Sequence, residues 1–320
     1  MTRIAVAADV LAQVQSLIDE RTPASEDRAA AIELVDVDSG ETAVAEGALR
    51  WGLDEAAFDG LLARAPELRW LHSPGAGVEG WPLAEIAARG ITLTNAAGVY
   101  AIPIAEWVLT RMLEIVKRTD EVRAGQRERR WVSGLAVGEL YGKTLLLLGS
   151  GGIAQQVIVR AAAFGMKILV ANRSGRPVEL ADRTVSGDAW RSLLPEADFV
   201  VSTLPLTPET TDLIGATELA RLPSTAWVIN VGRGGTIDQD ALFAALAEHR
   251  IGGAALDVFA IEPLPPESPG WALDNLIVSP HMSGDSEASQ GRSLELFADN
   301  AIRFAANEPL LNVVDLNAGY

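Results

Sequence analysis

Short apolar runs alternate with amphipathic stretches along almost the whole chain. In the N-terminal part, apolar residues recur at helical spacing in residues 10–20 and 55–64. The apolar runs between and around them are residues 4–8, 32–37, 48–51, 69–72 and 91–94. Short strands that alternate with helices are typical of a parallel sheet covered by helices on both faces. The pattern therefore predicts an α/β domain in this part of the chain.

A second alternation begins at an unbroken apolar run, residues 144–148. The run is followed by a glycine turn, a helical pattern to about residue 163, a stop at Gly165 and an apolar run at 168–170. This order is that of the βαβ unit that binds dinucleotides. Gly149 suits the tight turn, Gly151 lets the backbone approach a pyrophosphate at the helix N-terminus, and Ala154 permits close packing. We expect the cofactor to contact the turn residues Gly149, Ser150, Gly151, Gly152 and Ile153.

The alternation continues to the end of the chain. Strands are predicted at residues 199–204, 226–231, 253–258 and 276–279, and long helices at 104–117 and 286–306. The first long helix leads into the second domain, and we expect the last one to return to the first domain. The prediction is an α/β protein with two Rossmann/flavodoxin-like, doubly wound parallel-sheet domains and a cleft between them. Residues 1–98 with 285–320 would form a discontinuous substrate (lid) domain, and residues 99–284 the dinucleotide-binding domain.

The composition narrows the class of function. The chain has 320 residues, 48% hydrophobic and 22% charged, as expected for a two-domain globular α/β protein. A formal net charge of −17 disfavours nucleic acid or an anionic membrane as a partner, so an anionic substrate needs a local basic group. The chain has no cysteine, which excludes disulfides and thiolate catalysis, and we expect no metal site. Asp9 follows the N-terminus too closely for a signal peptide, and charges interrupt the long apolar runs. We therefore expect a cytoplasmic protein without a membrane span.

The end of the second strand of the βαβ unit bears on the choice of cofactor. An NAD enzyme usually places Asp or Glu there for the ribose hydroxyls, whereas this chain has Asn172, Arg173 and Ser174. An acid would repel a 2′-phosphate, while these side chains can donate hydrogen bonds to it and Arg173 can neutralise it. We therefore expect NADP(H) to be preferred, with NAD(H) as the alternative.

Two segments of the N-terminal part follow predicted strands, at the edge where open α/β sheets bind ligands. One begins at Trp51, and the other is the segment from Ser73 to Gly77. The small residues of the second segment leave backbone N–H groups accessible, which suits an anion as well as an ordinary turn. The candidate contacts to an acidic substrate are Trp51, Ser73, Gly75, Ala76 and Gly77.

The order and spacing of several motifs resemble the D-isomer-specific 2-hydroxyacid dehydrogenase family, and within it the glyoxylate and hydroxypyruvate reductases. The resemblance extends from about residue 48 to the C-terminus. Its motifs are residues 68–78 and 94–106, Leu204-Pro205-Leu206-Thr207-Pro208, Asn230-Val231-Gly232-Arg233-Gly234, Leu256-Asp257-Val258-Phe259, Glu262-Pro263-Leu264-Pro265 and Ser279-Pro280-His281. The resemblance implies reversible hydride transfer between a nicotinamide cofactor and a small 2-keto/2-hydroxy acid of the D series.

The family's catalytic trio corresponds to Arg233, Glu262 and His281. Imidazole can give and take a proton near neutrality, so His281 is the expected acid/base. A carboxylate at Glu262 would favour the protonated imidazole and raise the pKa of His281. Arg233 can bind the substrate carboxylate and polarise the carbonyl group. Taken singly, each of the three residues also suits a solvated loop or a packing role.

The resemblance implies further contacts and a partner. Asp257 would contact the nicotinamide carboxamide, and the small-molecule substrate would bind beside it. The expected cofactor contacts in this part of the chain are Leu204, Pro205, Val231, Gly232, Arg233, Asp257, His281, Ser283 and Gly284. The resemblance also implies a homodimer formed through residues 104–117 and 126–131.

Two other functions fit the same sequence. One is an NAD-linked dehydrogenase for a D-2-hydroxy acid such as D-lactate. The other belongs to a different class, the dinucleotide-sensing corepressors, which bind partner proteins and can retain the trio. Basic patches and disordered tails, which would favour a binding protein, are absent from the sequence.

Overall fold

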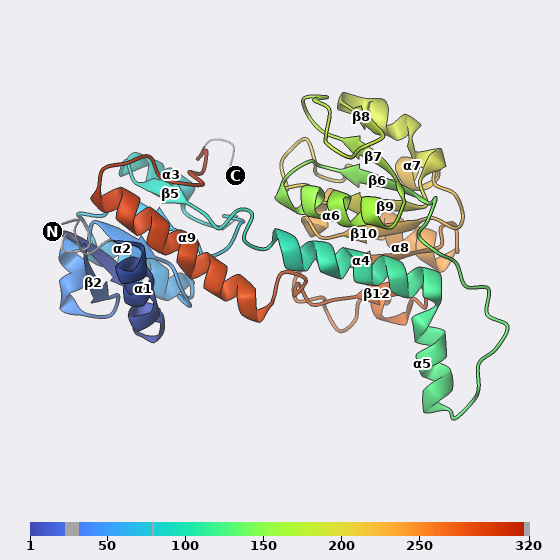
Figure 1. The fold of residues 1–320 in the computed structure, drawn as a ribbon, viewed down its shortest axis with the longest axis horizontal. Helices are drawn as coiled ribbons and strands as arrows, with labels where there is room; N and C mark the ends of the chain where they lie inside the picture. Colours follow the sequence, from blue (N-terminus) through green and yellow to red (C-terminus); the bar gives the residue numbers. More distant parts are fainter. Residues whose placement is uncertain (23–31, 79, 317–320) are drawn as a thin grey trace. The chain divides into compact units, whose positions relative to one another are not determined.

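The computed structural model describes residues 1–22, 32–78 and 80–316 (Figure 1). The chain divides into two compact units, of which unit 1 comprises Met1–Tyr100 with Ser286–Tyr320, and unit 2 comprises Ala101–Asp285. Both units are α/β structures with purely parallel sheets. The structure thus confirms the predicted fold class, an α/β protein with two parallel-sheet domains.

Unit 1 is built on a five-stranded sheet with the order β2-β1-β3-β4-β5, the flavodoxin-like arrangement. A strand points alternate side chains to opposite faces. Ile4 and Val6 therefore pack with α1 and α9, while Ala5 packs with α2 and its neighbours on the other face. The elements are β1 (Thr2–Val6), α1 (Ala8–Arg21), β2 (Ile32–Asp36), η2 (Gly40–Val44), β3 (Gly47–Leu49), α2 (Glu55–Arg64), β4 (Trp70–His72), α3 (Leu83–Ala88), β5 (Thr92–Thr94) and α9 (Glu287–Ala305).

Unit 2 is built on a seven-stranded sheet with the order β12-β11-β10-β9-β6-β7-β8. Helices cover both faces, so a central strand such as β6 is buried along its whole length and is apolar from Leu145 to Leu148. The strands are β6 (Thr144–Leu148), β7 (Lys167–Ala171), β8 (Arg183–Val185), β9 (Phe199–Ser202), β10 (Trp227–Asn230), β11 (Gly253–Leu256) and β12 (Leu276–Val278). The helices are α4 (Ala101–Lys117), α5 (Thr119–Arg127), α6 (Gly152–Ala163), α7 (Ala216–Leu219) and α8 (Gln239–Ala247), with 3-10 turns η3 (Gly187–Ser192), η4 (Leu194–Glu196), η5 (Gly234–Thr236) and η6 (Pro269–Ala272).

Some element boundaries differ from the prediction for identifiable reasons. The helix expected from residue 104 begins at Ala101, because Pro103 lies in the first turn, where its missing N–H group breaks no intrahelical bond. Ser286 caps α9 instead of belonging to it, accepting a hydrogen bond from the backbone N–H of Ser289. The short edge strand β8 and the helix α5 were not predicted. In the part of the chain that the structure describes, no helix is both long and apolar enough to cross a membrane.

Candidate active site

Six loops of unit 2 leave the same edge of the sheet. Since all seven strands are parallel, their carboxyl ends lie together, and this edge is where open α/β sheets bind ligands. Gly149 follows β6, Asn172 follows β7, and Leu204 lies just beyond β9. Arg233 lies just beyond β10, and Asp257 follows β11. The loop after β12 carries His281, so most of the predicted site residues of unit 2 belong to this one edge.

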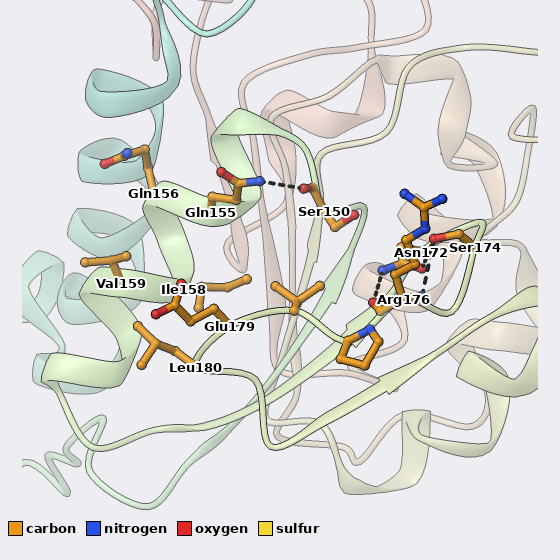
Figure 2. Close-up of a pocket in the computed structure, with 12 residues that line it drawn as sticks. Ser150, Gln155, Gln156, Ile158, Val159, Asn172, Ser174, Arg176, Glu179 and Leu180 are labelled. Atoms are coloured by element: carbon orange, nitrogen blue, oxygen red, sulfur yellow. Dashed lines mark hydrogen bonds between the residues drawn. The ribbon is translucent and has the colours of Figure 1, made fainter.

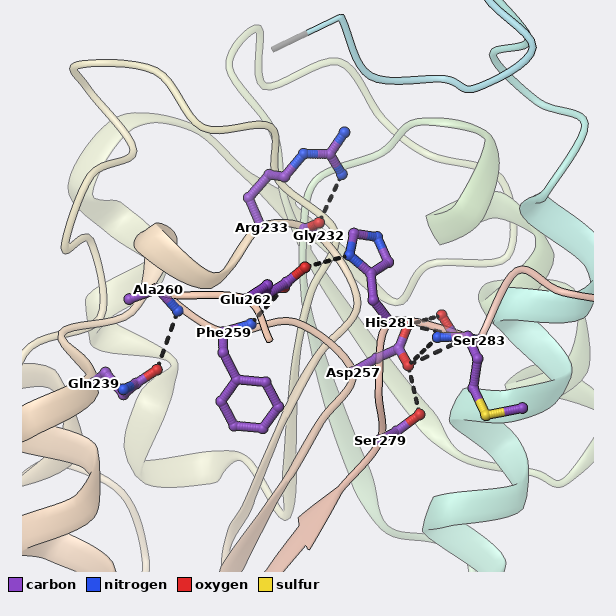
Figure 3. A network of polar contacts seen from close by, with 11 residues as sticks. Gly232, Arg233, Gln239, Asp257, Phe259, Ala260, Glu262, Ser279, His281 and Ser283 are labelled. Atoms are coloured by element: carbon purple, nitrogen blue, oxygen red, sulfur yellow. Dashed lines mark hydrogen bonds and ion pairs between the residues drawn. The ribbon is translucent and has the colours of Figure 1, made fainter. Parts of the chain in front are cut away.

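The centre of the edge is a contact between an imidazole and a carboxylate. Nδ1 of His281 lies 2.7 Å from Oε2 of Glu262. Figure 3 shows the two side chains pointing toward one another. The His281 side chain is 54% exposed, so its other ring nitrogen can reach a ligand from solvent. A carboxylate that accepts from Nδ1 fixes the tautomer of the imidazole and holds the ring in one orientation.

The segment that carries Glu262 is fixed from three directions. Oε1 of Glu262 accepts from the backbone N–H of Phe259 at 2.8 Å, and the N–H of Ala260 donates to Oε1 of Gln239 at 3.1 Å. Gly234 lies directly against the backbone of Phe259, since a Cβ on Gly234 would come within 1.9 Å of its carbonyl carbon. Only glycine permits this approach, which brings the Arg233 loop beside the segment. The half-buried Arg233 donates from Nη1 to the carbonyl oxygen of Gly232 at 2.8 Å (Figure 3).

The predicted contact to the nicotinamide, Asp257, is almost fully buried, at 1% exposure. Its carboxylate accepts hydrogen bonds from Ser279, Met282 and Ser283, which belong to the loop that carries His281. Ser283, itself predicted to contact the cofactor, donates both its N–H group and its hydroxyl group to this carboxylate. The structure therefore gives both residues a role within the protein, and their contact to the cofactor stays a prediction.

The glycine turn after β6 fits a dinucleotide. Gly149 has φ +106°, and a Cβ there would lie 2.5 Å from Oγ1 of Thr203, so the position requires glycine. A Cβ on Gly151 would meet no protein atom within 4 Å, which leaves open space beside the start of α6. The first turn of α6 contains no acidic residue, so its free N–H groups can receive a phosphate. Ala154 is fully buried against the sheet, as predicted for the third small residue.

A pocket of about 620 Å³ lies beside this turn. Asn172, Ser174 and Arg176 line one end of it, and Ser150 also contributes (Figure 2). The Asn172 side chain is engaged within the loop: Oδ1 accepts from the N–H of Gly175 at 2.6 Å, and Nδ2 donates to the carbonyl oxygen of Arg176 at 3.0 Å. Asn172 thus shapes the loop, and its predicted hydrogen bond to a 2′-phosphate stays a prediction. Among the described residues, the guanidinium of Arg176 has no hydrogen-bond or ion-pair partner.

The candidates of unit 1 lie at the carboxyl ends of β3 and β4. In the loop after β4, the carbonyl groups of Pro74, Gly75 and Ala76 accept hydrogen bonds. No described hydrogen bond uses the backbone N–H groups of Gly75, Ala76 or Gly77, which suits an anion site. Ser73 is buried, and Trp51 packs partly against the core of the unit.

His72 is fully buried and cannot reach a ligand. Its Nδ1 lies 2.8 Å from Oγ1 of Thr94, and its Nε2 has no hydrogen-bond partner among the described residues. Burial among apolar groups lowers the pKa of His72 from its usual 6.5 to about 3, so this ring stays neutral.

Several residues of this edge were missed by the sequence analysis. The sequence shows a second basic residue, Arg176, after Arg173, but Arg176 was not among the expected cofactor contacts. Other pocket residues come from α6 and from the segment after β7 and carry no motif; they are Gln155, Gln156, Val159, Pro177, Val178, Glu179 and Leu180. Within the described ranges, no group of three or more His, Asp and Glu side chains is arranged to hold a metal ion.

Comparisons with known proteins show the family to which the chain belongs. A family model described as the NAD-binding domain of D-isomer-specific 2-hydroxyacid dehydrogenases matches residues 109–283. A glyoxylate reductase of Korarchaeum cryptofilum is 36% identical over 256 residues, which cover 78% of this chain and 77% of that protein. The crystal structure of a D-isomer-specific 2-hydroxyacid dehydrogenase family protein from Aeromonas salmonicida matches with a TM-score of 0.85 and 31% identity, over 98% of this chain and 99% of that one.

A second solved structure has a bound cofactor. It is an NADPH-dependent glyoxylate/hydroxypyruvate reductase from Sinorhizobium meliloti in complex with NADP and sulfate. The match has a TM-score of 0.81 and 28% identity and covers 100% of both chains.

Proposed function

This chain belongs to the D-isomer-specific 2-hydroxyacid dehydrogenase family of NAD(P)-dependent enzymes, and on that premise we propose that it reduces a small 2-keto acid to the D-2-hydroxy acid with NADPH. Glyoxylate and hydroxypyruvate are the proposed substrates, in line with the relatives from Korarchaeum cryptofilum and Sinorhizobium meliloti. The observation that carries the proposal is the contact of His281 with Glu262 at 2.7 Å, at the edge that also carries the glycine turn of the βαβ unit.

The proposed acid is the imidazole of His281. When bound, the reduced nicotinamide supplies the hydride that converts a carbonyl carbon into a carbinol carbon. The developing alkoxide needs a proton, and the exposed ring nitrogen of His281 would donate it, taking it back in the oxidative direction. Glu262 would stabilise the imidazolium before transfer and keep the ring oriented through Nδ1. This arrangement supports an acid/base role better than a packing role, because neither side chain is buried.

Arg233 is the proposed ligand of the substrate carboxylate. A guanidinium can donate two parallel hydrogen bonds to a carboxylate and can polarise the adjacent carbonyl oxygen. The protein as a whole carries a formal charge of −17, so a local cation is needed to attract an anionic acid. We also propose that Trp51 and the N–H groups of Gly75, Ala76 and Gly77 contribute to substrate binding from unit 1.

We propose that NADPH is preferred over NADH because of the loop after β7. The residues there fit a 2′-phosphate: Arg176 and Ser174 line the pocket, Arg173 adds a second cation, and the ribose position has no acid. Asn172 would act by shaping the loop, through its hydrogen bonds to Gly175 and Arg176. The relative from Sinorhizobium meliloti, whose structure contains NADP, supports the same choice.

We propose further that the chain forms a homodimer through α4, α5 and the segment that follows. In unit 2, α5 and the segment that follows it project away from the sheet (Figure 1). It exposes large apolar side chains, with Trp131 92% and Val137 57% accessible. Light scattering tests the proposal, since Trp131→Arg should shift the protein toward monomer if Trp131 lies in the interface.

The proposed function is tested by following nicotinamide absorbance with a panel of 2-keto acids, using NADPH and NADH in parallel. We expect NADPH to be consumed with glyoxylate and with hydroxypyruvate, and the product of hydroxypyruvate to be the D-isomer of glyceric acid. Faster turnover with NADH would overturn the cofactor choice alone. Absence of turnover with every keto acid and both cofactors would overturn the enzymatic proposal and favour a dinucleotide-binding protein.

A further inference from the structure

The buried carboxylate of Asp257 has an unusual set of partners. Asp257 directly follows β11, and its own N–H group donates to the carbonyl oxygen of Asn230 on the neighbouring strand at 3.0 Å. The backbone of Asp257 is therefore fixed to β10. Its side chain is almost fully buried, and every hydrogen bond described for it comes from one loop, residues 279–283 (Figure 3).

That loop uses Asp257 as its anchor. The hydroxyl of Ser279 donates to Oδ1 at 2.6 Å, and the N–H of Met282 donates to the same oxygen at 2.9 Å. The N–H of Ser283 donates to both oxygens, at 3.2 and 3.0 Å, and the hydroxyl of Ser283 donates to Oδ2. The N–H of His281 completes the set by donating to the Asp257 carbonyl oxygen at 2.9 Å. Three consecutive backbone N–H groups and two hydroxyl groups thus converge on one residue.

These contacts nearly fill the acceptor capacity of the carboxylate. An ionised carboxylate offers about four lone-pair directions. Here four donor groups already point at its two oxygens, and one of them, the N–H of Ser283, is shared between both. A carboxamide of the cofactor would share these two oxygens with the loop, so a contact with the cofactor does not by itself explain this set of donors.

The loop needs an anchor because of the conformation of His281. Its φ is +54°, in the left-handed region that only a few per cent of non-glycine residues adopt, although Asn, Asp and His do so more often than the others. The His281 side chain is also 54% exposed, so packing does not fix the imidazole. Its position relative to Glu262 therefore depends on its backbone, and that backbone depends on Asp257.

We propose that Asp257 is a positioning residue: it holds His281 in the left-handed conformation that places Nδ1 against Glu262. The role rests on the proposed function only in so far as His281 is the acid/base. Asp257 needs no contact with substrate or cofactor to act in this way. The consequence is that changes at Asp257 or Ser279 reach the chemical step through the imidazole.

The test compares Asp257→Asn with Asp274→Asn, the same chemical change at an exposed residue of unit 2 that precedes β12. In Asp257→Asn an amide N–H₂ would face the donors of Ser283, which leaves buried groups unpaired. We expect kcat to fall about 10²-fold while the Kd for NADPH, measured by fluorescence titration, does not change. Asp274→Asn should leave both values unchanged. A raised Kd for NADPH with an unchanged kcat would overturn the proposal, because that split indicates contact with the cofactor.

Two further measurements keep the test decisive. Ser279→Ala retains the carboxylate and removes one hydroxyl, so it should lower kcat by a smaller factor even if Asp257→Asn does not fold. The chain has three histidines, and the ring signals of His281 can be followed by NMR and assigned by their loss in His281→Asn. We expect Asp257→Asn or Ser279→Ala to move the His281 signals and leave those of His72 and His249 in place. This readout does not need turnover, so unchanged His281 signals overturn the positioning role even if the wild type reduces no keto acid.

Discussion

Two histidines end or follow strands in the two units, and their surroundings differ in every respect that matters for chemistry. His72 closes β4 of unit 1, is fully buried, and has apolar rings of Trp70 and Phe297 beside it. His281 follows β12 of unit 2, is exposed, and contacts a carboxylate at 2.7 Å. Burial keeps the ring of His72 neutral, whereas the ring of His281 is accessible to solvent and to a ligand. The residue type alone thus predicts little, and the environment decides between packing and catalysis.

The largest effect is expected from removing the second histidine. His281→Ala should lower kcat/KM by about 10³-fold, because the proposed proton donor to the carbonyl oxygen is lost. Circular dichroism should show an intact fold. His249→Ala is the matched control, since that histidine lies beyond the end of α8 and is exposed. If His281→Ala retains near-normal turnover, the contrast between the two histidines has no bearing on catalysis.

A somewhat smaller loss of kcat/KM is expected when Arg233, at the same edge of the sheet, is replaced. Arg233→Ala should lower kcat/KM by about 10²-fold, since the substrate carboxylate loses its bidentate partner. Arg233→Lys should recover only part of the loss, because an ammonium group cannot reproduce the two parallel hydrogen bonds. Full activity in either variant would remove Arg233 from the site.

His72 should affect the pH dependence of the free energy of unfolding, but not the turnover. Its pKa in the folded chain, about 3, lies below the unfolded value of 6.5, so only the unfolded chain gains a proton as the pH falls through 6.5. The free energy of unfolding should therefore be highest above about pH 6.5 and lower by about 2 kcal/mol near pH 5.

The measurement is urea unfolding at both pH values, with His72→Leu for comparison. This variant removes the buried Nε2, which has no partner among the described residues, and should abolish this part of the pH dependence. His249→Gln serves as the control. An unchanged pH dependence in His72→Leu would show that the buried ring is not the group responsible.

The smallest effect is expected at the cofactor pocket. Arg176→Ala should weaken NADPH binding by about tenfold, which corresponds to the loss of one hydrogen bond to a charged group, and should leave NADH binding nearly unchanged. The measurement is a fluorescence titration with each cofactor. Equal losses for both cofactors would mean that Arg176 does not recognise the 2′-phosphate.

Much of the fold could be read from the sequence because its hydrophobic pattern is strong where elements are buried. The apolar run of β6, the glycine turn and the small residue Ala154 define the βαβ unit almost without tertiary information. The edge strand β8 (Arg183–Val185) could not be predicted, because it has only three residues and none of them is buried. The exposed helix α5 likewise has a single buried residue. Its sequence therefore lacks the apolar spacing that predicts a helix.

The site was predictable in its residue types and less so in its contacts. Motif order pointed to Glu262 and His281, and the structure brings their side chains together. The spacing of residues along the sequence could not show that the side chains of Asn172 and Asp257 form hydrogen bonds within the protein. Those hydrogen bonds depend on how two loops fold. Arg176 is visible in the sequence as a second basic residue near Asn172, but only the folded loop shows that it lines the pocket.

The central claim, that His281 and Glu262 act as one unit, is tested most directly by a double-mutant cycle on kcat/KM with His281→Ala and Glu262→Gln. If the carboxylate works only through the imidazole, Glu262→Gln should lower the rate in the wild-type background and cost nothing further once the imidazole is gone. Losses that simply multiply would contradict the account, because the two side chains would then act independently.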